Sequence, residues 1–257
     1  MTLQQDLQQR LQQKPVLLMT HLVLGYPSLD INREVIRQMA ENGVDCIELQ
    51  IPFSEPMADG PVILKANQDA LAAGITVQDC VSFAAAMVKE FPYVHFFFMT
   101  YCNIAFRYGF ADFIRQTAAI GLQGLIIPDL PPEEGDEYLR LAKENNLAAI
   151  MFFAPTSTDA RMTEVAGKGD GFIYCVARKG VTGAHTEVDS SLAGYLARCR
   201  NATSLPLAVG FGIASREDVA LLEGRADMAV IGTATIKLVD QKGPAAVGPF
   251  IRSLAAN

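Results

Sequence analysis

The feature of this sequence that most limits its fold is a regular alternation of short apolar segments with helical ones. Eight apolar segments are the expected strands, and they cover residues 16–24, 44–51, 93–101, 122–127, 147–153, 171–176, 205–209 and 226–231. The expected helices lie between and after them, at residues 32–42, 62–73, 77–90, 111–120, 133–145, 159–166, 190–200, 215–223 and 245–255. No linker or low-complexity block interrupts this order. Repeated strand-and-helix units of this kind indicate a parallel sheet.

Eight such units in 257 residues favour a closed barrel over an open sheet. A (β/α)₈ barrel, or TIM barrel, typically has about 250 residues, whereas an open doubly wound sheet has about five or six strands. We therefore predict an α/β fold with a single TIM-barrel domain over residues 1–257. Ahead of the first strand, Leu3, Leu7 and Leu11 share one helical stripe between polar residues, which predicts an extra N-terminal amphipathic helix.

The amino-acid composition limits which partners this protein can bind and in which cellular compartment it is expected. The net charge is −7 and no cluster of Lys or Arg stands out, so we expect no nucleic-acid partner. The longest apolar run, residues 147–154, falls far short of the roughly 20 residues of a membrane-spanning helix. The N-terminus does not have the pattern of a secretion signal, so we expect a cytoplasmic protein. Five cysteines without a C-x-x-C pair and three histidines without an H-x-x-x-H pair predict neither disulfides nor a metal site.

Two carboxylates are the expected catalytic groups, because active sites of such barrels lie where strands end. In the strand 44–51, alternation turns Glu48 and Gln50 toward the barrel interior. Burial disfavours the ionised form of a carboxyl group, which suits Glu48 to proton exchange near neutral pH. The proline-rich loop that follows carries Asp59 over the barrel mouth, and two carboxylates in different environments suit divided acid and base roles. The alternatives are a buried Glu48 that only accepts hydrogen bonds and an Asp59 that only starts a turn with Gly60.

Glycine-bearing segments after the last three expected strands predict a phosphate site. They lie at residues 179–183, 210–215 and 231–234. Glycine lets backbone N–H groups approach an anion, and a helix that begins at Thr233 adds the positive end of its dipole. Barrels often bind phosphate at the loops after strands seven and eight, although a single Gly-x-Gly is more often only a tight turn.

Aromatic residues at the same strand ends offer a wall for a flat ligand. These are Tyr101, Tyr174 and Phe211, of which one or two are expected to line a pocket while the rest belong to the core. Gly210 and Gly212 lack the third glycine and the partner acid of a dinucleotide fingerprint, so no such cofactor is expected.

Sequence motifs along essentially the whole chain resemble one known family. They are Ile47-Glu48-Leu49, Ile51-Pro52-Phe53-Ser54, Ala58-Asp59-Gly60-Pro61, Met99-Thr100-Tyr101 with Asn103, Arg107-Tyr108-Gly109, Ile126-Ile127-Pro128-Asp129-Leu130-Pro131 with Glu133-Glu134, Gly180-Val181-Thr182-Gly183 and Gly210-Phe211-Gly212-Ile213. In these motifs the chain resembles the tryptophan synthase alpha subunit. The resemblance implies a lyase of tryptophan biosynthesis that cleaves indole-3-glycerol phosphate to indole and D-glyceraldehyde 3-phosphate by retro-aldol acid/base chemistry. It also implies that this chain needs neither a metal nor an organic cofactor.

The resemblance also implies roles for particular residues. Glu48 falls on the general acid/base of the family and Asp59 on its second catalytic carboxylate. The implied substrate-binding residues are Tyr174, Thr182, Gly183, Phe211, Gly212, Gly232 and Thr233, of which Gly183, Gly212, Gly232 and Thr233 form the phosphate cradle. Protonation of indole C3 gives a cation that can accept the electrons of the breaking C–C bond, while Asp59 stabilises charge at the ring N–H.

A beta subunit is the partner that the resemblance implies, in an α₂β₂ heterotetramer in which the beta subunit holds pyridoxal phosphate. The implied docking segments are residues 57–59 and 128–132, and residues 178–186 are the implied lid. Two alternatives are a non-catalytic allosteric partner of a beta subunit and a stand-alone indole-releasing lyase.

Several positions depart from the family pattern. Gln50 stands where the family usually has Gly, and it enters the same interior as Glu48, where it can crowd the ring site or form a hydrogen bond there. Tyr26 and Glu55 each stand in place of a usual Asp, which bears on loop closure and on the fit of a partner. Thr233 in place of Ser keeps the hydroxyl group.

Overall fold

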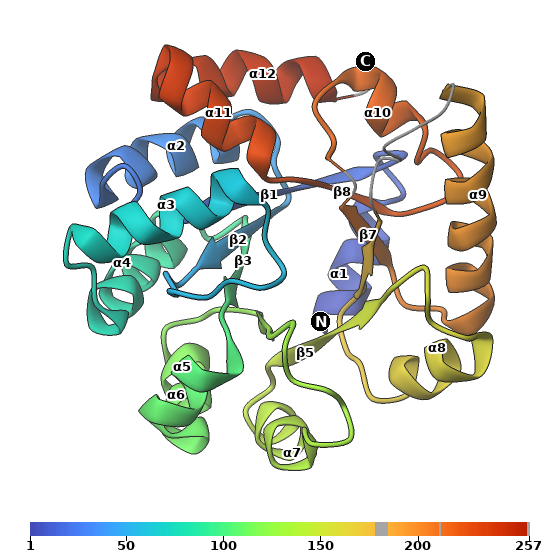
Figure 1. Cartoon of the computed structure of the whole chain (residues 1–257), viewed down its shortest axis with the longest axis horizontal. Helices are drawn as coiled ribbons and strands as arrows, with labels where there is room; N and C mark the ends of the chain where they lie inside the picture. The colour runs from blue at the N-terminus through green and yellow to red at the C-terminus, as the bar shows by residue number, and fades with distance from the viewer. Residues whose placement is uncertain (178–184, 211, 256–257) are drawn as a thin grey trace.

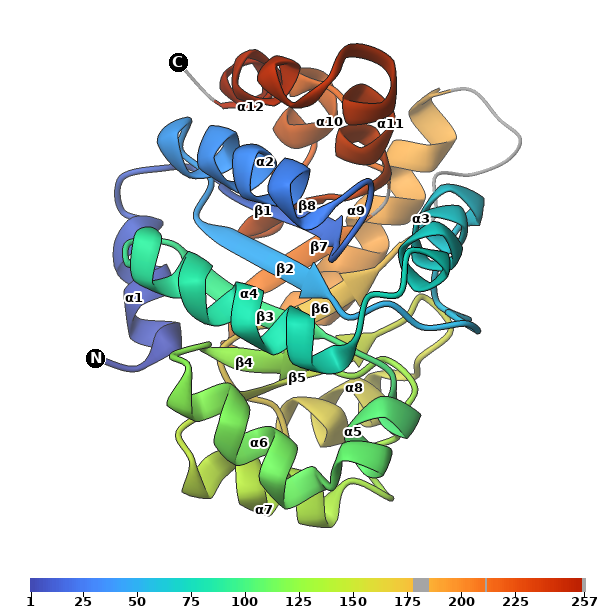
Figure 2. The same cartoon turned by 90° about the vertical axis from the view of Figure 1, so that its left-hand side faces the viewer.

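The computed structural model describes residues 1–177, 185–210 and 212–255, and the side chains of all of these except 185–190. Eight parallel strands pair in chain order from β1 to β8, and β1 pairs with β8 to close the barrel. Helices surround the strands on all sides in Figure 1, and Figure 2 shows the same helices along the length of the strands. The predicted TIM barrel is therefore confirmed.

Each strand overlaps the segment predicted for it. The strands are β1 (Leu17–Val23), β2 (Cys46–Gln50), β3 (His95–Met99), β4 (Gly124–Ile126), β5 (Ala148–Phe153), β6 (Ile173–Val176), β7 (Leu207–Gly210) and β8 (Met228–Ile231). Strands of a parallel barrel are covered on both faces, so their sequences are almost continuously apolar. All seven residues of β1 are buried, as this rule predicts.

The helices follow the strands in the order expected for βα units. They are α1 (Leu3–Arg10), α2 (Leu29–Glu41), α3 (Pro61–Ala72), α4 (Val77–Glu90), α5 (Cys102–Tyr108), α6 (Phe110–Ala119), α7 (Asp136–Glu144), α8 (Asp159–Ala166), α9 (His185–Ala202), α10 (Arg216–Ala220), α11 (Thr233–Lys242), the 3₁₀ turn η1 (Pro244–Ala246) and α12 (Val247–Leu254). Local sequence sets several of their starts. Thr76 and Asp79 form a capping box at α4, and Ser215 and Asp218 form one at α10.

Two helices were not among the expected ones. The short helix α5 follows β3 after only Thr100 and Tyr101, and its seven residues are too few for a clear helical period. Helix α11 was expected only as a helix start at Thr233. Its first residues include β-branched Thr235 and Ile236, which have weak helix propensity and are buried against the barrel.

The core has two layers separated by the barrel wall. The outer layer lies between strands and helices and includes Ile47 and Leu49, while Cys46, from the other face of β2, belongs to the inner layer. The interior layer also contains Phe97 and Phe172, whose rings pack edge to face 5.4 Å apart. The alternation predicted for β2 is therefore confirmed, and Glu48 faces the interior.

Helix α1 closes the end of the barrel at which the strands begin. Figure 2 shows it beside that end, and its residue Leu7 is fully buried in the interior layer. On its polar side, Asp6 accepts hydrogen bonds from Arg10 at 2.7 Å and contacts His95 at 2.5 Å. Burial alone raises the pKa of Asp6, but His95 and Arg10 together hold it below its usual value. The predicted N-terminal amphipathic helix is therefore present and anchored by both packing and charge.

No single helix in the described ranges is both long and apolar enough to cross a membrane. Helices α3 and α4 reach that length and apolarity only when taken together, across a bend of 108°.

Candidate active site

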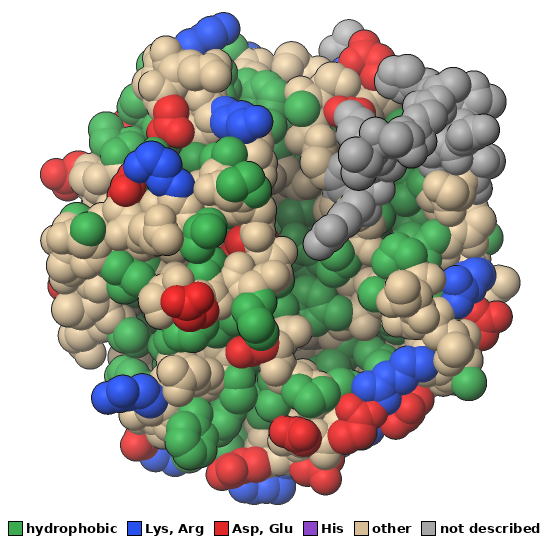
Figure 3. Space-filling view, in the orientation of Figure 1, with side chains coloured by type: hydrophobic (Ala, Val, Ile, Leu, Met, Phe, Trp, Pro, Cys, Tyr) green, Lys and Arg blue, Asp and Glu red, His purple; other side chains and the backbone are tan. Residues whose placement is uncertain are grey.

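A cavity of about 810 Å³ opens where the strands end. It is lined by the last residues of several strands, among them Met99, Ile126, Phe153 and Gly210, and by the loops that follow. Figure 3 shows a hollow at the centre of this face, with hydrophobic side chains in it. A partly apolar cavity of this size at the carboxyl end of a barrel is the usual position of an active site.

Six of the residues predicted for the site line this one cavity. They are Glu48, Asp59, Tyr174, Gly212, Gly232 and Thr233. The other three predicted residues, Thr182, Gly183 and Phe211, lie outside the described residues. The structure therefore brings together side chains that are up to 185 positions apart in the sequence, from Glu48 to Thr233.

Glu48 lies in the middle of β2, and its side chain is only 4% exposed. One carboxylate oxygen, Oε1, lies 3.4 Å from Nδ1 of His21, the residue opposite it on β1. The other oxygen, Oε2, is buried and has no hydrogen-bond partner among the described residues. Glu48 therefore has one oxygen beside a histidine and one that can meet a bound molecule in the cavity.

Asp59 reaches the cavity from the loop between β2 and α3, and two side chains hold it there. Nε2 of Gln50 donates a hydrogen bond to Oδ2 of Asp59 at 2.7 Å, and the Tyr101 hydroxyl donates one to the same oxygen at 3.1 Å. The Tyr101 oxygen in turn accepts the backbone N–H of Ala58 at 3.1 Å. The interior position predicted for Gln50 is confirmed, and what Gln50 binds there is the second carboxylate.

Two aromatic side chains line the same cavity as the carboxylates. The rings of Tyr174 and Phe152 lie 5.3 Å apart, and both residues line the cavity. Burial, and then the negative charges of Glu48 and Asp59, raise the pKa of the Tyr174 hydroxyl well above its usual value. Tyr174 is therefore a neutral side chain suited to contact with a flat apolar ring. Tyr101, in contrast, is 1% exposed and acts through Asp59.

The glycine-rich end of the cavity combines backbone and helix features. Gly212 has a φ of +84°, a conformation that L side chains rarely adopt, and Gly232 is the N-cap of α11. Thr233, the first residue of α11, and Lys237, one turn later, also line the cavity. A helix N-terminus attracts anions because its N–H groups are unpaired and its dipole is positive at that end.

Among the lining residues missed by the sequence analysis are Phe152, beside Tyr174, and two titratable residues, His21 and Lys237. Alternation along β1 from the interior residue Met19 places His21 on the interior face, so this signal was available for His21. For Lys237 no comparable signal existed, because helix α11 was not predicted beyond its start.

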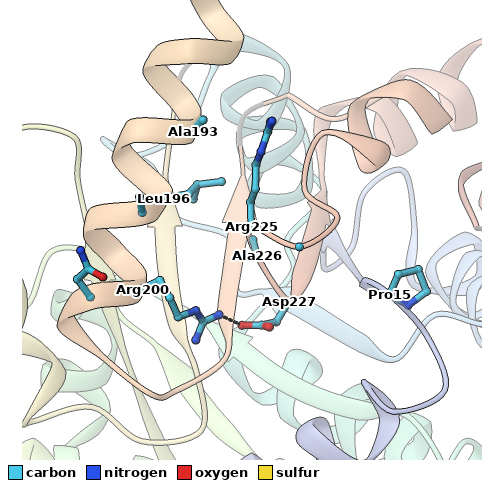
Figure 4. A pocket seen from close by; sticks show the side chains of 10 residues that line it. Pro15, Ala193, Leu196, Arg200, Arg225, Ala226 and Asp227 are labelled. Atoms are coloured by element: carbon cyan, nitrogen blue, oxygen red, sulfur yellow. Dashed lines mark hydrogen bonds and ion pairs between the residues drawn. The ribbon is translucent and has the colours of Figure 1, made fainter.

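A second cavity of about 460 Å³ lies at the opposite end of the strands, between α9 and the segment that leads into β8 (Figure 4). Its clearest polar feature is an ion pair between Arg200 and Asp227. Asp227 also accepts the backbone N–H of Leu207 at 2.7 Å, so this pair joins α9 to the beginnings of β7 and β8. We assign it a structural role.

Within the described residues, no group of three or more His, Cys, Asp or Glu side chains lies close enough together to hold a metal ion.

Comparisons with known proteins agree with this geometry. Residues 7–248 match the family model described as tryptophan synthase alpha chain. The tryptophan synthase alpha chain of Desulfotalea psychrophila is 58% identical over 99% of this chain and 100% of its own length. The tryptophan synthase alpha chain of Syntrophotalea carbinolica is 54% identical over 98% of this chain and 99% of its own length. The crystal structure of tryptophan synthase subunit alpha from Legionella pneumophila superposes with a TM-score of 0.89 at 28% identity, covering 99% of this chain and 97% of that one. The chain therefore belongs to the tryptophan synthase alpha chain family.

Proposed function

We propose that Glu48 and Asp59 carry out the reaction of this family, in which the alpha subunit of tryptophan synthase cleaves indole-3-glycerol phosphate during tryptophan biosynthesis. The chain is a lyase of this kind by its family. The observation that supports the two residues is that both carboxylates line one cavity, in different surroundings. Glu48 is enclosed in the strand wall, whereas Asp59 is held on a loop by two hydrogen bonds. Different surroundings are what divided acid and base roles require.

The proposed chemistry needs only proton transfers and one C–C cleavage. Glu48 gives a proton to C3 of the indole ring and takes the proton of the hydroxyl beside the breaking bond. The electrons of that bond move into the protonated ring, which becomes indole, and the hydroxyl carbon becomes the aldehyde of D-glyceraldehyde 3-phosphate. Asp59 faces the ring N–H and stabilises the positive charge that the ring carries before the bond breaks.

The substrate has an apolar ring and a phosphate, and the cavity offers aromatic side chains for the ring and a helix N-terminus for the phosphate. The indole ring packs against Tyr174 and Phe152, and the phosphate lies at Gly212, Gly232 and Thr233, at the start of α11. Thr182, Gly183 and Phe211 complete this proposed site. They stay predictions, since they lie outside the described residues.

The family implies a beta-subunit partner, and we propose the α₂β₂ heterotetramer, with docking at the rim of the cavity. Met57 is 82% exposed in the loop that carries Asp59, and Phe106 is 70% exposed on α5. Met57 belongs to the predicted docking segment 57–59, and docking at that segment and at residues 128–132 stays a prediction. Pyridoxal phosphate then belongs to the beta subunit, and this chain works without a cofactor. We further propose one domain over residues 1–257 and a cytoplasmic location.

The test is release of indole from indole-3-glycerol phosphate by the purified chain, with and without a cognate beta chain. We expect Glu48→Gln and Asp59→Asn each to lower turnover by about 100-fold or more, the scale of a lost acid/base group. A near-normal rate in either variant would contradict its assignment. Fast release that a beta chain does not change would favour a stand-alone lyase. No release by the unmodified chain in either setting would favour a non-catalytic allosteric partner.

A further inference from the structure

His21 is a buried histidine for which the proposed mechanism has no task. It lies on β1 directly opposite Glu48 in the pairing of β1 with β2. The His21 side chain is 5% exposed, and its Nδ1 lies 3.4 Å from Oε1 of Glu48. A titratable ring in contact with the proposed general acid/base, and in the same cavity, is placed to affect what that group does.

The free atoms of this pair point to the substrate. Nε2 of His21 and Oε2 of Glu48 are both buried and lack a hydrogen-bond partner within the described part of the chain. Buried polar atoms in proteins are nearly always paired, and exceptions cluster at functional sites. Since His21 and Glu48 both line the cavity, a substrate bound there can reach these atoms.

The charges around His21 favour its protonated form. The titratable groups that line the main cavity together with His21 are Glu48, Asp59, Tyr174 and Lys237, and Tyr26 lines a small separate pocket with His21. Burial alone lowers the pKa of His21, but the charge of Glu48 and then that of Asp59 raise it above the usual 6.5. Tyr174 and Tyr26 are neutral, since burial raises the pKa of both hydroxyls. The two carboxylates therefore raise the pKa of His21 by more than burial lowers it.

We propose that His21 is a positioning residue for Glu48: its protonated ring holds Oε1 and so presents Oε2 to the substrate. The inference rests on the proposed function and adds one residue to it. His21 keeps its proton throughout, while the transferred protons pass between Oε2 and the substrate. Without the ring contact, the carboxylate can rotate about its last bond, and a smaller fraction of molecules has an oxygen aligned with the reacting atoms.

The proposal predicts a specific pH dependence. As the pH rises through the raised pKa of His21, the ring loses its charge and the hold on Oε1 weakens. Cleavage by the unmodified chain should therefore decline on the alkaline side of a midpoint above pH 6.5. The comparison with a His21 variant decides the origin of the decline: a decline that persists unchanged without the His21 ring belongs to another group, such as Glu48 itself as the proton donor.

The kinetic experiment measures indole release from indole-3-glycerol phosphate between about pH 5.5 and 9. We expect His21→Gln, which keeps a donor but no charge, to lower kcat about 10-fold with KM changed less than about threefold, and to lose the alkaline decline. His21→Phe, with no donor, should be slower still. His95→Gln is the matched control, because His95 lies on β3 in contact with Asp6 of α1 and outside the cavity, and it should keep both kcat and the pH profile.

A second measurement does not depend on catalysis. Histidine NMR titration, with the His21 signal assigned by its loss in His21→Gln, should show His21 titrating above pH 6.5 in the unmodified chain and lower in Glu48→Gln. If the pKa of His21 is the same in Glu48→Gln as in the unmodified chain, the interaction between His21 and Glu48 is refuted.

The outcomes for His21 and for the proposed function can be told apart. If His21→Gln keeps the kcat and pH profile of an active unmodified chain, the role of His21 is overturned and the proposed function stands. If the unmodified chain releases no indole, the proposed function fails. The proposal for His21 then fails as well, even if the NMR titration shows that Glu48 raises the pKa of His21.

Discussion

Replacing Gln50 by Met tests whether this side chain holds the second carboxylate in place. Gln50 is fully buried, and its Nε2 donates a 2.7 Å hydrogen bond to Oδ2 of Asp59. Met has a similar volume and shape but cannot donate, so Gln50→Met removes the hydrogen bond with little change in packing. A hydrogen bond to a charged group contributes about 1.5–3 kcal/mol, and each 1.4 kcal/mol is a factor of about ten.

The expected result follows from that range. With only the Tyr101 hydroxyl left on Oδ2, Asp59 should occupy its active position less often. We expect kcat/KM for indole-3-glycerol phosphate cleavage to fall between about 10-fold and about 150-fold in Gln50→Met. The double variant with Tyr101→Phe should approach the rate of Asp59→Asn, because both hydrogen bonds to Oδ2 are then lost.

The assay is steady-state indole release, with urea unfolding of each variant to show that the barrel is intact. A folded Gln50→Met variant with the kcat/KM of the unmodified chain would refute the role assigned to Gln50. A large loss of stability without a specific loss of kcat/KM would instead show that Gln50 is a packing residue.

Two further predictions concern stability. We expect Gly25→Ala to destabilise the barrel by about 1–3 kcal/mol in urea unfolding, since a Cβ there would overlap Ile75 and φ is +84°. Gly224→Ala, at a φ of +72° with open space around the Cβ, should cost less, and equal losses would contradict the overlap argument. Because its neighbours lower the pKa of Asp6, the stability that Asp6 adds is present above its usual value of 3.8 and is lost as pH falls through its lowered pKa. The difference in unfolding free energy between the unmodified chain and Asp6→Asn should therefore shrink from pH 7 toward pH 2.5, and a constant difference would contradict it.

The fold could be predicted from the sequence because its main signals are local. Each barrel strand is a short buried run, and alternation within β2 was enough to separate interior from exterior residues. Helices α5 and α11 could not be predicted in the same way. Helix α5 has only seven residues, too few for a clear helical period, and α11 contains β-branched residues of weak helix propensity that are buried against the barrel.

The candidate site could be predicted only as far as single residues on strand ends. Alternation placed Glu48 in the interior, and the proline-rich loop suggested that Asp59 returns over the mouth. The contact of His21 with Glu48 depends on the register of β1 against β2, which follows from closure of the whole barrel. The bond from Gln50 to Asp59 depends on the path of a loop, and residue type alone does not determine that path.

Helix α1 blocks the barrel interior at the end where the strands begin. Leu7 fills the interior at the end where the strands begin, so a molecule in the cavity has its way out at the end where they finish. Substrate and product therefore pass through the same opening, so a product has to leave before the next substrate molecule enters. A partner docked at that rim, as proposed above, would cover this opening and would lie in the path of a released product.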